Sequence, residues 1–312
     1  MLNRTYCLLF ALLAVSLASA QSAGASGSAG VSTPAENQAA IAATNAAVTG
    51  EQCGIDSTVV FLNDVGATSP QISVSGYIQS LTQAKAGLDA YENTPNLGGL
   101  LNYIVTSVRP VELHVLDEIQ IGADSSNVTV AQRVALRADL LTQLGNYSGC
   151  AIAADKSFGN AKVQYYNATI AQLDTQISNL SAAGVDTSNL TGIINTGITE
   201  SVDPLSGAVN GASTQAQVFA ALNSYCLYDG CPAGFNYHLD QRFGIAKIGL
   251  IINALSGSAG VNQGELTQAS GDLAQANAEM NSVGSAQDTQ AQYNVIWDNV
   301  TAAATLAATA AG

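Results

Sequence analysis

Apolar side chains recur in this chain at alternating intervals of three and four residues. One long stripe contains Val163, Tyr166, Ile170, Leu173, Ile177 and Leu180, and another contains Leu266, Ala269, Leu273, Ala276, Met280 and Val283. Shorter stripes cover residues 77–91 and 245–255. This spacing puts the apolar side chains on one face of an α-helix, as in antiparallel bundles and coiled coils. No segment competes convincingly with the alternation of a β-strand. The sequence therefore predicts an all-α fold.

Residues 163–226 and 238–301 resemble two copies of one helical unit. The segment that begins Gly184-Val185-Asp186 recurs as Gly260-Val261-Asn262, and the segment Thr214–Gln217 recurs as Thr289–Gln292. The two matches are offset by 76 and 75 residues, so they share one register. Neighbouring copies can bury one another's apolar faces. We therefore predict an antiparallel helical bundle or array built from a duplicated unit of about 75 residues.

Several residue types mark where the helices begin and end. Thr129-x-x-Gln132 and Thr214-x-x-Gln217 have the form of a capping box, and Ser285-x-x-Asp288 resembles it more loosely. Gly184 and Gly260 follow the first long helix of each copy, where a left-handed residue is expected. In the less regular region before the repeats, we expect helix breaks at Pro95 and at Arg109-Pro110.

The chain begins like a secreted protein. Residues 1–20 combine Arg4, an apolar stretch and the small-residue site Ala18-Ser19-Ala20, which predicts a secretory signal peptide. Residues 21–35 form a flexible leader rich in Ala, Gly and Ser. We expect an N-terminal helical region at 36–153 and a C-terminal helical domain with the two repeats at 158–312. No later segment is long and apolar enough to predict a transmembrane helix.

The charge balance is strongly acidic. The chain has 9 Lys and Arg against 23 Asp and Glu, a net charge of −14. Nucleic acids and anionic membrane surfaces both require basic patches, so the composition argues against either partner.

Four cysteines follow the signal peptide: Cys53, Cys150, Cys226 and Cys231. An even number in an exported chain favours two disulfides. Cys226 and Cys231 flank a turn-forming stretch, which leaves Cys53 to pair with Cys150. A zinc site made of all four cysteines is the alternative, although the usual C-x2-C spacing is missing.

Six sequons offer candidate sites for N-glycosylation, at Asn127, Asn146, Asn167, Asn179, Asn189 and Asn299. They predict a glycoprotein if the host glycosylates its secreted proteins.

Motifs typical of catalysis or of a metal site are missing from the sequence. His114 and Glu118 would share one helix face, with Arg109, Glu112 and Asp117 nearby. Such a pair suits a general base or two metal ligands, but it is also common on a solvated polar face, which we prefer here. The sequence therefore predicts no catalytic residue, no metal site and no cofactor.

A cluster of aromatic residues surrounds the second cysteine pair: Tyr225, Tyr228, Phe235, Tyr237 and His238. Aromatic side chains on a disulfide-closed turn could form a rigid platform for a protein or glycan partner. The alternative is that they pack between the two repeats, which is the more frequent role of aromatic residues.

These observations favour a secreted, non-catalytic structural or interaction protein that works outside the cell or at its envelope. A soluble helical carrier that binds an apolar small molecule between its helices is the alternative, because helical bundles often hold ligands there.

Overall fold

The computed structural model describes residues 33–124, 127–228, 230–231, 234–256, 258 and 260–311. These residues are overwhelmingly helical, which confirms the all-α prediction. The predicted signal peptide, residues 1–20, and residues 21–32 of the predicted leader lie outside the described residues. The helices are α2 (Pro34–Thr68), α3 (Ser75–Leu88), α4 (Leu97–Tyr103), α5 (Arg109–Asp124), α6 (Val130–Ala182), α7 (Ser188–Gly197), α8 (Asp203–Gly211), α9 (Gln215–Ser224), α10 (Leu239–Ser256), α11 (Gln263–Val283) and α12 (Gln290–Ala311).

Three short helical segments and two short strands complete the described elements. A 3-10 segment, η2 (Asp89–Tyr91), follows α3. Two π-helical segments, η3 (Ile104–Val108) and η4 (Ile198–Val202), join α4 to α5 and α7 to α8. The strands β1 (Tyr225–Cys226) and β2 (Phe235–Asn236) pair in parallel, with Tyr225 opposite Phe235.

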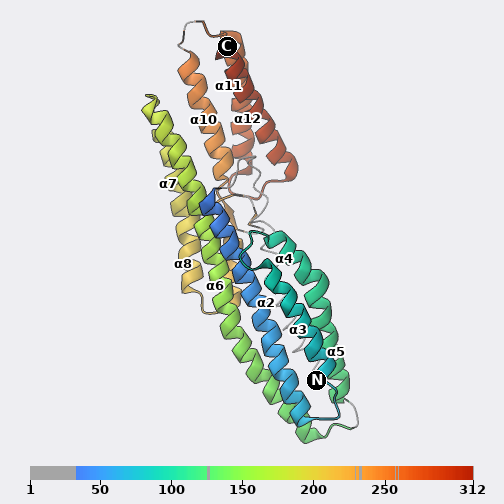
Figure 1. Cartoon of the computed structure of the whole chain (residues 1–312). Helices are drawn as coiled ribbons and strands as arrows, with labels where there is room; N and C mark the ends of the chain where they lie inside the picture. Colours follow the sequence, from blue (N-terminus) through green and yellow to red (C-terminus); the bar gives the residue numbers. More distant parts are fainter. Residues whose placement is uncertain are drawn as a thin grey trace. The chain divides into compact units, whose positions relative to one another are not determined.

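The chain forms two compact units (Figure 1). Among the described residues, the first unit contains 33–165 together with Ala208–Phe219, and the second contains Tyr166–Gly207 together with 220–311. Helix α6 contributes residues to both units, because its 53 residues run through the boundary.

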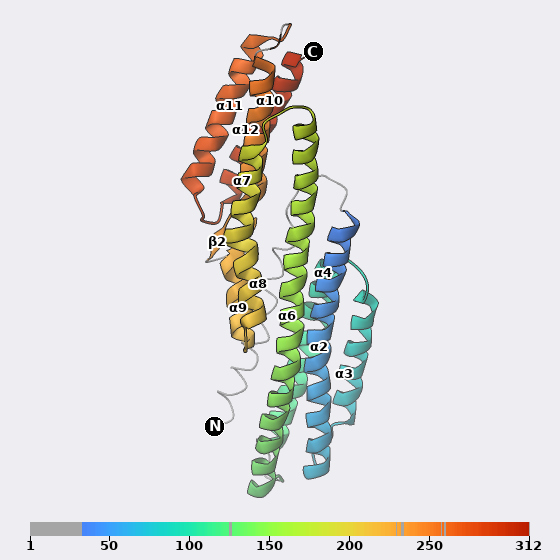
Figure 2. The ribbon, with the colours of Figure 1, turned by 90° about the vertical axis from the view of Figure 1, so that its left-hand side faces the viewer.

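In the first unit, four helices and the beginning of α6 surround one apolar core. Helix α2 lies between α3 and α6 in both views (Figure 1, Figure 2). Fully or nearly fully buried aliphatic side chains fill the core, including Leu62, Val65, Leu81, Leu88, Leu100, Ile104, Val108, Val115, Ile119 and Leu136. Leu81 and Leu88 belong to the stripe predicted over residues 77–91, and both are completely buried.

The helical run from α4 to α5 passes through Pro110 without a break, so the break predicted at Arg109-Pro110 is wrong. Proline has no N–H, and the carbonyl four residues before it therefore lacks its usual α-helical donor. The π-helical segment Ile104–Val108 accommodates this mismatch directly before Arg109. The other predicted break is confirmed, since η2 ends at Tyr91, before Pro95, and α4 begins at Leu97.

The second π-helical segment has the same sequence context. Ile104–Pro110 and Ile198–Pro204 both read I-x-x-S-V-x-P, and in each the π turn ends two residues before the proline. Among the described residues, each half of the chain thus contains a π-helical segment shortly before a proline within a helical run.

In the second unit, α10, α11 and α12 pack against one another (Figure 2). The start of α11 lies beside the end of α12, because the Asn262 N–H donates to the Ala310 carbonyl at 3.1 Å. These two helices are therefore antiparallel. Ala269, Ala303 and Ala307 are almost fully buried, and their small side chains let the helix backbones approach closely. The stripe predicted over residues 266–283 faces this core, with Leu266 and Met280 also buried.

The predicted helix starts are confirmed at two capping boxes and wrong at a third. The Gln132 and Gln217 backbone N–H groups donate to the hydroxyls of Thr129 and Thr214, and each glutamine side chain accepts from the threonine N–H. The expectation for Ser285-x-x-Asp288 is wrong, because α12 begins at Gln290. Its capping box is Thr289-x-x-Gln292.

Both repeat glycines have the expected left-handed backbone, with φ of 83° at Gly184 and 88° at Gly260. After each glycine, an Asx side chain accepts hydrogen bonds at the next helix start: Asp186 from the Ser188 N–H, and Asn262 from the N–H groups of Gly264 and Glu265. The local signals therefore match between the two segments, whereas the duplication itself stays a prediction.

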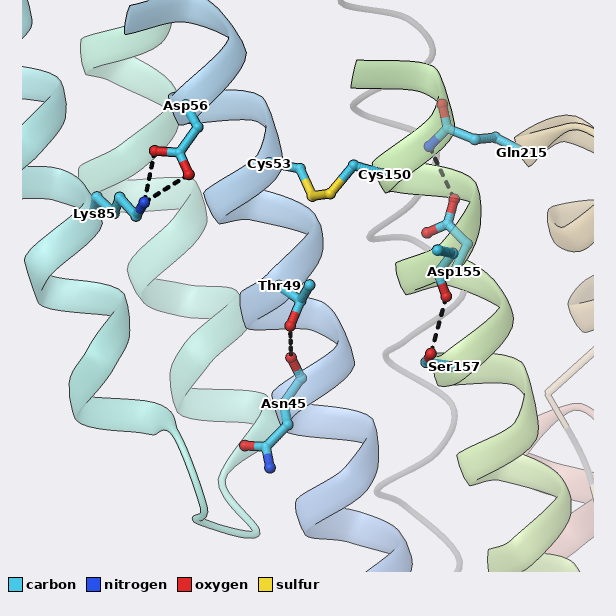
Figure 3. Close-up of a disulfide and its surroundings, with 10 residues drawn as sticks. Asn45, Thr49, Cys53, Asp56, Lys85, Cys150, Asp155, Ser157 and Gln215 are labelled. Atoms are coloured by element: carbon cyan, nitrogen blue, oxygen red, sulfur yellow. Dashed lines mark hydrogen bonds and ion pairs between the residues drawn. A yellow bond between two sulfur atoms is a disulfide. The ribbon is translucent and has the colours of Figure 1, made fainter. Parts of the chain in front are cut away.

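The two predicted disulfides are confirmed. Cys53 on α2 bonds to Cys150 on α6 within the first unit (Figure 3), and Cys226 bonds to Cys231 in the second unit. The alternative of a zinc site made from the four cysteines is wrong, because all four sulfur atoms are engaged in these bonds.

Candidate functional site

A cluster of charged side chains lies buried in the first unit, where α2 and α5 meet. Arg109 on α5 donates from Nη2 to Oε1 of Glu51 on α2 at 2.8 Å. It also donates from Nη1 to Oε2 of Glu112, one turn further along α5, at 3.2 Å. Glu112 is only 4% exposed and Glu51 8%. One guanidinium therefore faces two carboxylates in a poorly hydrated environment.

The helical pattern explains how charged residues reach this position. Val48 and Ile55 are buried on α2, and Glu51 lies between them at helical spacing. On α5, Glu112 occupies the buried face four residues after Val108 and three before Val115. Both glutamates thus occupy positions that an apolar residue would normally fill.

Burial dominates the electrostatics of the cluster. It raises the pKa of Glu112 to about 7, partly against the opposing effect of Arg109 and with a further increase from Glu51. Burial likewise raises the pKa of Glu51, while Arg109 lowers it and Asp155 raises it. Glu51 and Glu112 can carry two negative charges, whereas Arg109 supplies one positive charge. Near neutral pH the cluster therefore favours the binding of either a proton or an additional cation.

A second layer of polar groups comes from α6 and α9. The Gln215 side chain donates to Asp155 at 2.9 Å (Figure 3), and burial raises the pKa of Asp155 to about 6. Burial and the nearby Glu51 raise the pKa of the Tyr147 phenol, which therefore stays protonated at neutral pH. Tyr147 can act as a hydrogen-bond donor at this site.

A cavity of about 60 Å³ opens beside Glu112 and Tyr147, entirely within the first unit. Most of its surface is apolar and comes from Phe61, Leu116, Leu140 and Leu144. The other lining residues are Gly54 and five with polar side chains: Ser57, Thr58, Glu112, Gln143 and Tyr147. Gly54 leaves room between Glu112 and Tyr147, since a Cβ atom at Gly54 would lie 3.6 Å from Tyr147 Cε2 and 3.7 Å from Glu112 Oε1. An apolar pocket with a few polar groups is typical of small-molecule sites.

The predicted pair His114 and Glu118 lies outside this cavity. His114 is exposed and packs edge-on against Tyr77, with 6.1 Å between the ring centroids. The Tyr77 hydroxyl donates to Glu118 at 3.4 Å. The preferred interpretation of a solvated face is wrong for Arg109 and Glu112, because both side chains are buried.

The five aromatic candidates divide by exposure. Tyr228, Tyr237 and His238 are buried, and His238 is completely inaccessible. Tyr237 donates from its hydroxyl to the Ile193 carbonyl at 2.8 Å and stacks near Arg242. Tyr225 and Phe235 are half-buried. The group therefore provides mostly internal packing, and a platform facing solvent could include only Tyr225 and Phe235.

The candidate glycosylation sites are mostly accessible. Asn127, Asn146, Asn167, Asn179 and Asn189 are exposed, whereas Asn299 is half-buried and donates from its side chain to the Val295 carbonyl. Exposure permits glycan attachment at the first five and does not test it.

Within the described ranges, no group of three His, Cys, Asp or Glu side chains is arranged to hold a metal ion. No helix in the same part of the chain is long and apolar enough to cross a membrane. Comparison of the sequence and structure with protein-family models, curated proteins and solved structures finds no match.

Sequence reasoning missed Glu51, Tyr147 and Asp155 as parts of a site. The available signal was a glutamate within an apolar helical stripe, as in Val48-x-x-Glu51-x-x-x-Ile55. A single charge at a core position is weak evidence by itself, but it becomes informative once its arginine partner is known.

Proposed function

We propose that this chain is an exported, non-catalytic carrier that holds a small, partly apolar molecule in the pocket beside Glu112 and Tyr147. One observation carries the proposal: a mainly apolar cavity ends at a buried carboxylate and a phenol, both positioned by rigid helices. Aliphatic walls with a few fixed polar groups bind a ligand through its apolar surface and orient it through its polar end.

Export is part of the proposal. Two disulfides are compatible with an oxidising compartment, as is a sequence that begins like a signal peptide. A pocket fixed between disulfide-linked helices would keep its shape outside the cell without further partners.

Native mass spectrometry of protein secreted by its own host tests the proposal. We expect additional mass that disappears on denaturation, beyond the chain, two disulfides and any glycans. The Gly54→Ala variant should lose this mass, because the new methyl group occupies the space between Tyr147 and Glu112. Gly271→Ala on α11 is the matched control, since a Cβ there meets nothing within 4 Å. The same additional mass on both variants would contradict the proposal.

A second candidate is an interaction role, with another copy of the same chain as the partner. Val130, Val134 and Leu141 are 76%, 65% and 53% exposed and follow one face of α6. A stripe with this spacing can pair with an identical stripe. Light scattering should then show a dimer that Val134→Lys dissociates, with Thr142→Lys, on an exposed part of the same helix, as the control. A monomer at all concentrations would reject this role.

A further inference from the structure

The first unit contains a buried glutamate, Glu112, that lines an open cavity. Glu112 Oε2 accepts from Arg109, but Oε1 has no hydrogen-bond partner among the described residues. Oε1 lies 3.7 Å from the Cβ position of Gly54, and both residues line the cavity. Glu112 as a whole is 4% exposed, and its Oε1, which no described residue donates to, can accept from a ligand or from water in the cavity.

The charges around Glu112 favour a positively charged ligand group as the hydrogen-bond donor to Oε1. Arg109 is the one cationic group that contacts Glu51 and Glu112 in the described part of the chain. Asp155 adds to the negative potential at Glu51. A second positive charge beside Glu112 would balance the cluster, whereas an anionic ligand would be repelled.

The lining and the volume of the cavity limit the chemistry and the size of the rest of the ligand. Phe61, Leu116, Leu140 and Leu144 provide apolar surface. A cavity of about 60 Å³ has room for roughly four or five water-sized groups. A short alkyl chain with one polar end fits this space, and a longer chain can extend through the open side.

We propose that the pocket binds a small organic cation, a primary alkylammonium group whose nitrogen donates to Glu112 Oε1 and whose chain packs on the aliphatic wall. This inference rests on the proposed carrier function and specifies its ligand class. Glu112 is the counter-charge, Tyr147 flanks the nitrogen, and Gly54 provides the space in which the ammonium group lies.

The state of Glu112 makes binding dependent on pH. Burial raises the pKa of Glu112 to about 7, while Arg109 opposes and Glu51 adds to this effect. An alkylammonium keeps its proton throughout this range, as the lysine side chain does. Binding should therefore strengthen by about thirtyfold from pH 5.5 to pH 8, as Glu112 loses its proton.

An NMR titration of the folded protein with three probes of equal chain length tests the inference. The probes are n-butylamine, n-butanol and butyrate, followed at the amide resonances of Gly54 and Leu144. We expect saturable shifts with n-butylamine at pH 8, with an affinity at least about tenfold above that for n-butanol, and no binding of butyrate. Glu112→Gln should remove the preference for the amine. Asp117→Asn, which removes an exposed negative charge from the same helix, should keep this preference.

The outcomes separate the ligand class from the carrier function. Equal binding of n-butanol and n-butylamine, or an amine preference that survives Glu112→Gln, overturns the cation inference and leaves the pocket as a ligand site. No shift with any probe also overturns the inference, while the native mass of the secreted protein decides the carrier function separately. If Glu112→Gln fails to fold, Gly54→Ala replaces it, because this variant closes the space without removing charge and should abolish the amine shifts.

Discussion

Arg109 and Glu51 join α5 to α2 through a 2.8 Å hydrogen bond between charged groups that are 13% and 9% exposed. The two residues are 58 positions apart in the chain. Buried pairs of this kind are expensive to form, yet removing one partner is strongly destabilising because the other charge stays buried. The cluster around Arg109 is therefore the part of the first unit most sensitive to substitution.

Arg109→Met should lower the free energy of unfolding by about 3–5 kcal/mol at pH 8. The substitution keeps much of the apolar stem and leaves Glu51 and Glu112 facing each other without a cation. The loss should be smaller at pH 5, where the glutamates can take up protons. Chemical denaturation measures both values, and Arg137→Met, an exposed arginine on α6, should change the free energy by no more than about 0.5 kcal/mol. Equal effects of the two substitutions would show that the cluster is not important for stability.

The wild-type protein should become less stable as the pH rises from 5 to 8. The pKa of Glu112 is raised from 4.5 to about 7 in the folded state, so the folded state holds this proton more tightly than the unfolded state. The resulting stabilisation is complete below pH 4.5 and is lost as the pH rises through 7, by about 3 kcal/mol for Glu112 alone. Glu51 and Asp155, whose pKa values are also raised, act in the same direction.

Glu112→Gln isolates the contribution of Glu112, because glutamine resembles the protonated acid. Thermal unfolding of this variant should depend less on pH between 5 and 8 than that of the wild type. Glu200→Gln in η4, which changes an exposed glutamate in the second unit, should keep the wild-type slope. A Glu112→Gln profile parallel to the wild type would contradict the raised pKa.

The two disulfides should contribute unequally to stability. Cys53 and Cys150 are separated by 97 residues and Cys226 and Cys231 by 5. Loop-closure entropy gives about 5 kcal/mol for the long loop and about 2 kcal/mol for the short one. Replacing each pair with alanine and comparing chemical denaturation midpoints tests this order. A larger loss for the short loop would mean that the Cys226–Cys231 bond acts through local packing around Leu227 and not through chain entropy.

Local sequence signals were sufficient to predict most of the helical framework. The three-four spacing located the buried faces of α3 and α11, whereas on α10 only Ile252 of the predicted stripe is buried. The glycines at 184 and 260 have the left-handed backbone that their positions indicated. These signals act over a few residues, so one sequence is enough to read them. The disulfide pairing could be predicted because Cys226 and Cys231 flank a short turn, which leaves Cys53 to pair with Cys150.

The buried cluster could not be predicted because it depends on contacts between distant segments. Arg109 and Glu112 resemble a solvated pair on an isolated helix, and only the packing of α2 against α5 removes them from water. Pro110 was misleading for a related reason. Proline usually ends a helix, but here the π-helical segment Ile104–Val108 accommodates the missing N–H of Pro110 and the helix continues. Whether a helix continues past a proline in this way depends on the packing of the surrounding core. The cavity depends on side-chain shape and has no sequence signature.

Two glycines on α6 should respond in opposite directions to the same substitution. A Cβ on Gly159 would lie 2.8 Å from both methyl groups of Val209, which is completely buried. Gly159→Ala should therefore lower the free energy of unfolding by about 1–3 kcal/mol, because helix and side chain must move apart. Gly145→Ala meets nothing within 4 Å and should raise it by up to about 1 kcal/mol through helix propensity. Chemical denaturation of both variants measures the difference, and a stabilising Gly159→Ala would show that segment 208–219 does not pack on α6 as described.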